Sequence, residues 1–250
     1  MEFLKSRFRN EQQFRLFAML ALASFFCGLL VAGRAYIIRH DLTHINTLKD
    51  LYWFRAPTFF FLLWNLFLAW VPYLTALKVE RLQRLGSSRL LLWLGLIVWL
   101  AFLPNAPYII TDFIHLRHRP PVPFWYDLFL FFTTASLGLI LGLLSLYEIH
   151  LVLKRWFSKT FAQLLILSAI GLCGFGVWLG RFQRWNSWDI VTRPDALLLD
   201  IANTLATRHA LVHAVGISAL LSGILLMGYG LLTVMLDDSK THSGKTRPLK

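Results

Sequence analysis

The chain carries two short polar stretches set within otherwise apolar sequence. In the first, Asp112 and His115 lie three residues apart, a spacing that places both side chains on one face if the backbone is helical. A carboxylate beside an imidazole can orient the ring or accept its proton, so the two are candidate catalytic residues, as a general base and its orienter. The alternative is an Asp–His pair solvated at a membrane surface.

Two prolines precede this pair, with Asn105 between them. Pro104 and Pro107 each remove a backbone donor and clash with the preceding turn, so we expect the helix to kink or unwind here. At least one carbonyl among residues 100–104 should lose its helical partner. Within a membrane, that carbonyl needs a protein group, water or a ligand, which makes Asn105 a candidate substrate-binding residue.

The second stretch ends another apolar run and is rich in arginine. It adds four candidate substrate-binding residues: Arg181, Arg184, Asn186 and Asp189. Two guanidinium groups can hold a phosphate or a carboxylate. The alternative is a structural network in which the arginines neutralise carboxylates such as Asp112, Asp127 and Asp189. Because Asp112 and Arg181 stand at matching ends of two parallel spans, we expect these two to form one electrostatic unit. Trp185 and Trp188 fit the aromatic belt of a membrane interface.

Histidines recur in three spaced pairs: His40/His44, His115/His118 and His209/His213. Such spacing suits metal ligands on a helix and loosely resembles the histidine boxes of membrane desaturases. No pair has adjacent histidines, and the topology below places every pair outside, whereas desaturase boxes face the cytosol. We therefore predict no metal and no cofactor. The sequence also lacks a nucleotide-binding loop, a nucleophile elbow and a zincin motif.

The elements that position these residues follow from composition. Of the 250 residues, 57% are hydrophobic and 15% charged, and the mean hydropathy is +0.58. A water-soluble monomer of this size cannot bury so much apolar surface, which excludes a soluble enzyme, a disordered chain and a secreted disulfide scaffold. Six charge-free segments are long enough to cross a bilayer: 16–33, 56–77, 90–111, 128–147, 160–180 and 214–236.

Each segment is expected to be helical because a backbone in lipid must satisfy its own hydrogen bonds, and none alternates as barrel strands do. The predicted fold is an all-α, polytopic integral membrane bundle of six transmembrane helices over residues 1–236. A disordered, basic cytoplasmic tail is expected over 237–250. The first span has a basic lead and a tolerable cleavage site at Val31-Ala32-Gly33, but its apolar run exceeds a signal-peptide core, which favours a retained anchor.

Lysine and arginine are unevenly distributed between the connections. With the N-terminus inside, 15 of them are cytoplasmic and 10 lie outside, so the positive-inside rule places both termini in the cytoplasm. The net charge of +12 thus reflects the membrane topology, and it would attract anionic lipid head groups. We expect membrane lipids as partners and no nucleic acid; the sequence leaves the oligomeric state unknown.

Both polar stretches end spans that run outward, so we expect them to meet on the extracytoplasmic face in a polar, partly water-filled pocket. Segment 190–209 should cover that pocket. Pro194 suits a helix start, and Leu197, Ile201 and Leu205 recur every four residues, which predicts a short helix in the interface. Small residues at Gly138/Gly142 and Gly176/Gly180 would allow close helix approach.

The two stretches resemble the hallmarks of a known family. They read Leu103-Pro104-Asn105-Ala106-Pro107-Tyr108 with Thr111-Asp112-x2-His115, and Gly180-Arg181-Phe182-x-Arg184-Trp185-Asn186-Ser187-Trp188-Asp189. The family is the uncharacterised bacterial membrane family called domain of unknown function 1361 (DUF1361). The resemblance implies a multi-pass protein of the bacterial cytoplasmic (inner) membrane and brings no assigned activity.

Three functions fit these observations. An enzyme would use Asp112 and His115 on an anionic or lipid-linked small molecule, an envelope substrate held by the arginines. A structural or accessory subunit would use the polar cluster to lock the bundle. A small-solute or proton-coupled transporter would use the broken third helix, but it ranks lower because few polar residues, among them Asn65, continue toward the cytoplasm.

Overall fold

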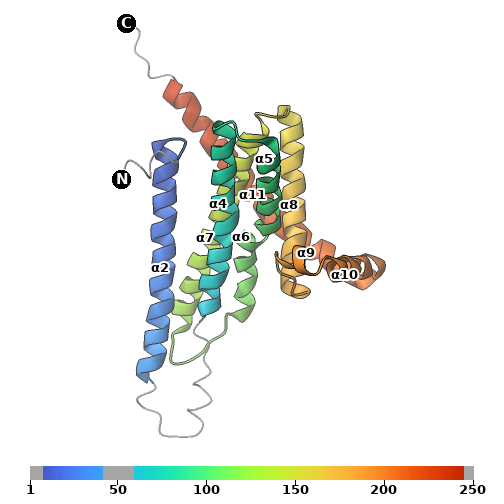
Figure 1. Cartoon of the computed structure of the whole chain (residues 1–250). Coiled ribbons are helices and arrows are strands. Elements are labelled where there is room, and N and C mark those ends of the chain that lie inside the picture. Colours follow the sequence, from blue (N-terminus) through green and yellow to red (C-terminus); the bar gives the residue numbers. More distant parts are fainter. Residues whose placement is uncertain (1–7, 42–58, 245–250) are drawn as a thin grey trace.

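A computed structural model describes residues 8–41 and 59–244 of the chain, with side chains up to Leu236. Every named element in those ranges is a helix (Figure 1). Six segments are long and apolar enough to cross a membrane, which confirms the all-α, multi-pass membrane fold. They are α2 (Glu11–Asp41), α4 (Phe60–Arg84), α5 (Arg89–Phe102) with its continuation, α7 (Phe124–Leu153), α8 (Lys159–Phe182) and α11 (Arg208–Gly244).

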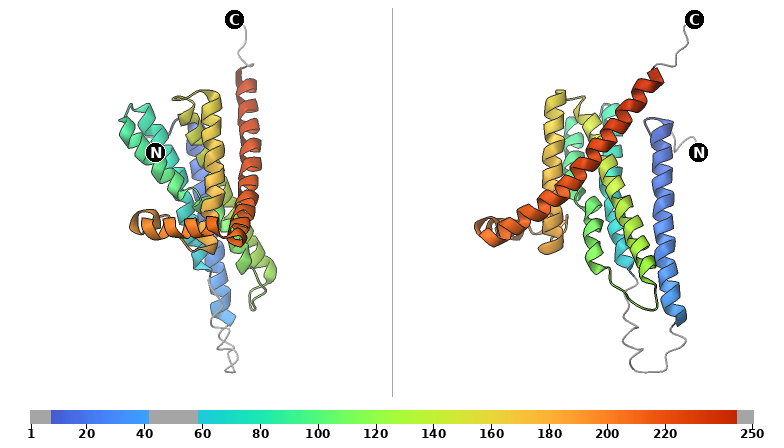
Figure 2. Two further views of the ribbon diagram at one scale, coloured as in Figure 1. Left: turned by 90° about the vertical axis from the view of Figure 1, so that its right-hand side faces the viewer. Right: turned by 180° about the vertical axis from the view of Figure 1, so that it is seen from behind.

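The third span continues beyond α5 as two short pieces, α6 (Asn105–Tyr108) and the 3₁₀ helix η2 (Ile109–His115). Two further helices, α9 (Asp189–Thr192) and α10 (Pro194–Ala206), join α8 to α11. Helices α2, α8 and the third span end on the same side of the bundle, where α4, α7 and α11 begin (Figures 1 and 2). We call this side the outer end, because the sequence predicts that it faces outside.

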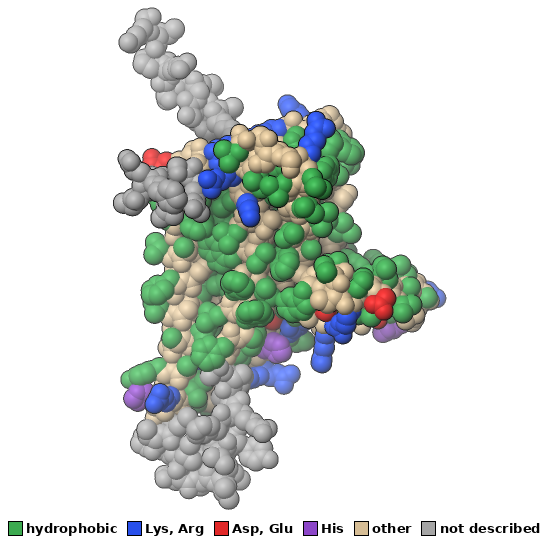
Figure 3. Space-filling model, in the orientation of Figure 1, with side chains coloured by type: hydrophobic (Ala, Val, Ile, Leu, Met, Phe, Trp, Pro, Cys, Tyr) green, Lys and Arg blue, Asp and Glu red, His purple; other side chains and the backbone are tan. Residues whose placement is uncertain are grey.

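Helix α7 is the centre of the bundle and the most buried of the six spans. It packs against α2, α4, α6, α8 and α11. On α4, the buried side chains recur at helical spacing, as in Leu62, Leu66, Ala69 and Tyr73. Helix α11 crosses the back of the bundle obliquely (Figure 2), and it shares with α2 the lowest burial among the spans. Exposed apolar side chains cover the middle of the bundle, while charged ones gather at its two ends (Figure 3).

Glycines let α7 and α8 close on the broken part of the third span. A Cβ atom at Gly138 of α7 would lie 2.7 Å from the Ala106 carbonyl oxygen, and one at Gly176 of α8 would lie 2.5 Å from the Pro104 ring. The other member of each predicted pair also faces this segment. Since lipid gives helices little hydrophobic reason to associate, this close van der Waals packing is a principal stabilising contact.

Two boundaries differ from the sequence-based expectation. The first span does not end at residue 33, because α2 continues to Asp41 and carries a buried Arg34 whose charge is neutralised within the bundle. The tail was expected to be disordered from residue 237, but α11 continues to Gly244. Extending an existing helix adds one hydrogen bond per residue without a new nucleus, so a polar segment can prolong a membrane helix.

Helix α10 confirms the predicted short helix, with Pro194 in its first turn. Its predicted place as a cover over the polar residues is wrong. It packs on α9 and α11 and extends sideways, away from the bundle (Figures 1 and 2). Exposed Leu198, Leu199 and Leu205 give it the apolar surface of an interfacial helix, so contact with lipid accounts better for its position.

Candidate functional site

The third span breaks where the two prolines predict. Helix α5 ends at Phe102, and the Ala106 backbone N–H donates to the Leu103 carbonyl at 3.1 Å instead of reaching Phe102. The freed Phe102 carbonyl accepts a hydrogen bond from the Asn105 side chain at 3.0 Å. The same Asn105 amide donates to the Ser187 hydroxyl at 2.9 Å. Asn105 therefore repairs the break and joins the first polar stretch to the second.

Asp112 is the acceptor at the centre of the site. Its side chain is only 1% exposed. It accepts hydrogen bonds from the Asn65 amide of α4 at 2.7 Å and from the Arg181 guanidinium of α8 at 3.1 Å. The ion pair between Asp112 and Arg181 follows from the parallel direction of their spans and is present as expected. Three helices therefore meet at one buried carboxylate.

Arg181 also binds His115, on the solvent side of the carboxylate. One guanidinium nitrogen lies 2.9 Å from His115 Nε2, and another donates to the Tyr108 hydroxyl at 3.4 Å. A guanidinium has donors only, so Nε2 must accept, and the ring must be neutral with its proton on Nδ1. Since the His115 residue is exposed, Nδ1 is the nitrogen left to donate outside this network.

The direct Asp112–His115 contact considered for the catalytic pair does not occur among the hydrogen bonds of the described residues. Asp112 points inward, His115 lies at the surface, and Arg181 stands between them. The cause is the burial of the η2 face that carries Asp112, which brings the carboxylate to Asn65 and Arg181. Asp112 therefore acts on His115 only through the arginine.

Asn186 and Asp189 of the second stretch bind each other. Asp189 accepts from the Asn186 backbone N–H at 2.8 Å, from the Asn186 amide, and from Arg193 at 3.0 Å. The Asn186 backbone hydrogen bond is the main cause that lowers the pKa of Asp189, with Arg193 adding to it. Asn186 and Asp189 thus close a turn and make no hydrogen bond to Asp112 or His115 within the described chain.

Arg184 is exposed and adopts a left-handed backbone conformation, with φ of +62°. It takes part in none of the ion pairs formed by the described residues. The structure therefore brings Asp112, His115 and Arg181 into one network, links Asn105 to it through the second stretch, and leaves Arg184 available at the surface.

Sequence reasoning missed several members of this site. Asn65 was considered only as a step on a transport route, yet it binds Asp112; its signal was a polar residue inside a span. Arg34 was placed in an outer loop, but it is fully buried and binds Asp127 through two hydrogen bonds, at 2.7 and 3.0 Å. Tyr108 and Ser187 stand in the two family motifs, but the sequence alone assigned them no role.

The outer end has more exposed cations than free carboxylates. Three buried aspartates there each have an arginine partner: Asp112 with Arg181, Asp127 with Arg34, and Asp189 with Arg193. Exposed Arg117, Arg184 and Arg208 add positive charge and form no ion pair within the described residues. Figure 3 shows arginine and histidine side chains along this edge. Such a rim is suited to an anionic group.

Neither a metal site nor the expected polar pocket stands out at this end. Within the described residues, no group of three or more potential ligands converges; His44 lies outside those residues, and His213 accepts a hydrogen bond from the Trp178 indole at 3.2 Å. A cavity of about 360 Å³ does exist, but it lies between α8, α10 and α11 and its lining is mainly apolar. The polar, partly water-filled pocket stays a prediction.

A comparison with protein-family models matches residues 64–224, more than half of the chain, to a family described as "Protein of unknown function (DUF1361)". The match contains both polar stretches and Asn65. Searches of curated proteins and of solved structures found no match.

Proposed function

The chain belongs to the DUF1361 family of unknown function, and we propose that it is a membrane enzyme that acts on an anionic, lipid-linked substrate at its outer face. The observation that carries the proposal is the position of Arg181. Its guanidinium binds a buried carboxylate on one side and an exposed imidazole on the other. An arginine fixed in this way can present its remaining donors to a phosphate or carboxylate.

In this proposal Asp112 positions Arg181 and His115 transfers the proton. A substrate anion that binds Arg181 competes with His115 Nε2 for the guanidinium donors. The released Nε2 lone pair can then act as a general base, while Arg181, with Arg184, stabilises negative charge on the substrate. Asn105, Asn186 and Asp189 hold the second stretch in place rather than touching the substrate.

The proposed localisation is the cytoplasmic membrane of a bacterium, with this end outside. The charge distribution of the sequence supports that orientation. Membrane lipids and an anionic, lipid-linked small molecule are the proposed partners. Because the substrate is amphiphilic, it can reach the site laterally from the outer leaflet, and the exposed cations of the rim would attract its head group.

A structural or accessory role is the second candidate, and the pairing of Asp112 favours it. This carboxylate is almost completely buried and already has two donors from two helices. A network that only locks a bundle needs its members paired and dry, and Asp112 meets that requirement. The two candidates differ in the role of His115. The enzyme needs this histidine as a base, whereas a structural network does not need its exposed side chain.

The test compares His115→Gln with His118→Gln in cells that lack the native gene. Both histidines are exposed, but only His115 contacts Arg181. Envelope lipids are profiled by mass spectrometry at matched protein levels. We expect an anionic lipid species that depends on the wild-type protein to persist with His118→Gln and to disappear with His115→Gln. Identical profiles for the wild type, both variants and the empty cells would support the structural candidate instead.

A further inference from the structure

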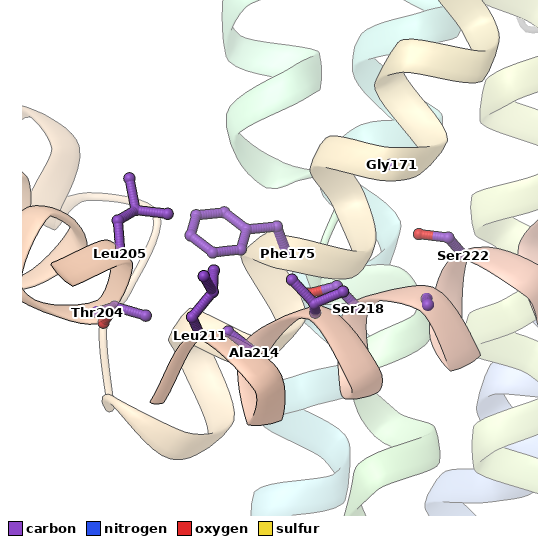
Figure 4. A pocket seen from close by; sticks show the side chains of 10 residues that line it. Gly171, Phe175, Thr204, Leu205, Leu211, Ala214, Ser218 and Ser222 are labelled. Atoms are coloured by element: carbon purple, nitrogen blue, oxygen red, sulfur yellow. The ribbon is translucent and has the colours of Figure 1, made fainter. Parts of the chain in front are cut away.

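We infer that the cavity between α8, α10 and α11 is a binding site for one acyl chain of an anionic phospholipid, with Arg208 at its mouth. This site is separate from the Asp112 network and does not depend on the activity proposed there. Its volume of about 360 Å³ lies in the range of small-molecule sites. Figure 4 shows Phe175 of α8 facing Leu205 of α10 and Leu211 of α11 across the cavity.

The lining is suited to hydrocarbon. Small or apolar residues such as Gly171, Ala214, Val215 and Ala219 form the wall along α8 and α11. Val215 and Leu205 are each 57% exposed, so the cavity opens to the side of the bundle, where the spans meet lipid. Because a polar ligand would gain little from these walls, an alkyl chain is the occupant that they favour.

Two serines of α11 lie deeper along the same wall. Ser218 lines the cavity, and its hydroxyl oxygen is buried and has no hydrogen-bond partner among the described residues. Ser218 is ten residues further along α11 than Arg208, about 15 Å at the helical rise, so it lies beside the acyl chain rather than at the head group. Ser222, one turn further along, is already bound to the Ile170 carbonyl.

Arg208 supplies the charge. Residues 208, 211, 215, 218 and 222 recur at spacings of three and four and therefore share one face of α11. Arg208 is the first residue of this helix, so its exposed guanidinium lies at the outer end of the cavity face. The first turn of α11 has no acidic residue, and the free N–H groups of a helix start add to the attraction for a phosphate.

An apolar cavity that continues inward from an exposed cation along one face of a membrane helix matches an anionic phospholipid, with the phosphate at Arg208 and an acyl chain in the cavity. The neighbouring α10 has the surface of an interfacial helix and contributes Thr204 and Leu205 to the wall. We assign the site to the phospholipid rather than to a second copy of the chain because the cavity opens toward lipid at Leu205 and Val215 and an exposed cation stands at the outer end of the same helix face.

The test is native mass spectrometry of the purified protein after delipidation and incubation with palmitoyl-oleoyl phosphatidylglycerol or phosphatidylcholine. We expect one retained phosphatidylglycerol per chain and preference over phosphatidylcholine by about fivefold, which Arg208→Gln should abolish. Ala219→Trp should fill the cavity and weaken retention by about tenfold. Its matched control is Leu220→Trp, at the neighbouring exposed position that does not line the cavity.

Thermal unfolding in detergent checks that each variant is folded. If Ala219→Trp does not fold, Val215→Trp replaces it, with Val212→Trp as its exposed control outside the cavity. Equal retention by a folded cavity variant and its control would overturn the proposal. So would equal retention of the two lipids by the wild type, or a dimer that Ala219→Trp dissociates without any bound lipid.

Discussion

At Arg181, one guanidinium group connects a carboxylate that is nearly inaccessible to solvent with an imidazole that is exposed to it. Burying a charged pair costs solvation free energy, and the pair is favourable only when its geometry and additional hydrogen bonds compensate. Asn65 supplies one such bond to Asp112, and Tyr108 accepts another from Arg181. The stability of this buried ion pair therefore depends more on the hydrogen-bonding groups of its neighbours than on how they pack.

Removal of one partner should cost more than removal of both. We expect Asp112→Asn to destabilise the protein by about 3 kcal/mol, because it leaves the Arg181 charge partly buried. Combined with Arg181→Gln, it should show a coupling energy of about 1–3 kcal/mol, measured by reversible unfolding in detergent. The control cycle uses Arg15 and Glu11, an exposed pair on α2, whose coupling should stay below about 0.5 kcal/mol. Additive effects of Asp112→Asn and Arg181→Gln would contradict a shared network.

The sequence predicted the Asp112–Arg181 pair but not its hydrogen-bond partners. Both residues end charge-free spans that run in the same direction, so span counting alone brings them to one side of the membrane. The partner Asn65 lies inside a different span, and its rotation about the α4 axis depends on which face α4 packs against α7. Nothing in the spacing of a single helix determines that rotation, since residues 60–77 of α4 are largely apolar on all sides apart from Asn65.

At the scale of the helices, α2 is held to α7 by ion pairs near both of its ends. Arg34 binds Asp127 where neither side chain is exposed, and Arg9, just before the helix, binds Glu148 at 3.1 Å. The Tyr126 hydroxyl adds a hydrogen bond to the Leu30 carbonyl at 2.7 Å. Because α2 is among the least buried spans, polar contacts carry a large share of its attachment.

Asp127→Asn should therefore loosen α2 more than any apolar truncation on its exposed face. The variant removes the Asp127 charge that faces the buried Arg34 guanidinium, and we expect a loss of about 3–5 kcal/mol. Hydrogen exchange of α2 amides, measured by mass spectrometry, should rise along the outer half of the helix. Arg15→Gln is the control because its ion pair is exposed. Unchanged protection of α2 in Asp127→Asn would show that the ion pair does not hold the helix.

The contact between Gly176 and the Pro104 ring provides a second test at this scale. A Cβ at Gly176 would lie 2.5 Å from that ring, so Gly176→Ala must push α8 away from the break. We expect a loss of about 1–3 kcal/mol and a weaker Asp112–Arg181 pair, since Arg181 lies near the end of the same helix. Unfolding measurements should show little effect for Gly171→Ala, which meets nothing within 4 Å. Equal stability of the two variants would contradict the close contact between Gly176 and the Pro104 ring.

Local chemistry explains which elements the sequence could predict. The break at Pro104 and Pro107 follows from missing backbone donors, and the start of α10 follows from Pro194; both are properties of a few adjacent residues. The direction of α10 is not local, because it depends on α9, α11 and the lipid surface. For the same reason, the cover over the polar residues was predicted wrongly although the helix itself was predicted correctly.

In the whole molecule, both polar stretches lie at the outer end of the six-span bundle. The chemistry proposed for them is therefore confined to one face of the membrane. Even numbers of spans return the chain to the side on which it began, and the start of α2 and the end of α11 do lie on the same side (Figure 2). Which side of the membrane that is rests on the distribution of lysine and arginine. The substrate class proposed for Arg181 and His115 requires the outer end to face the envelope.

Cysteine accessibility in spheroplasts tests this requirement most directly. His118→Cys, next to the His115 network, and Ser88→Cys, in the connection at the opposite end, are both exposed positions; the native Cys27 and Cys173 are buried. We expect a membrane-impermeant maleimide to label His118→Cys in intact spheroplasts and Ser88→Cys only after the membrane is permeabilised. Labelling of Ser88→Cys but not of His118→Cys in intact spheroplasts would contradict the account, because the Asp112–Arg181–His115 network would then face the cytoplasm.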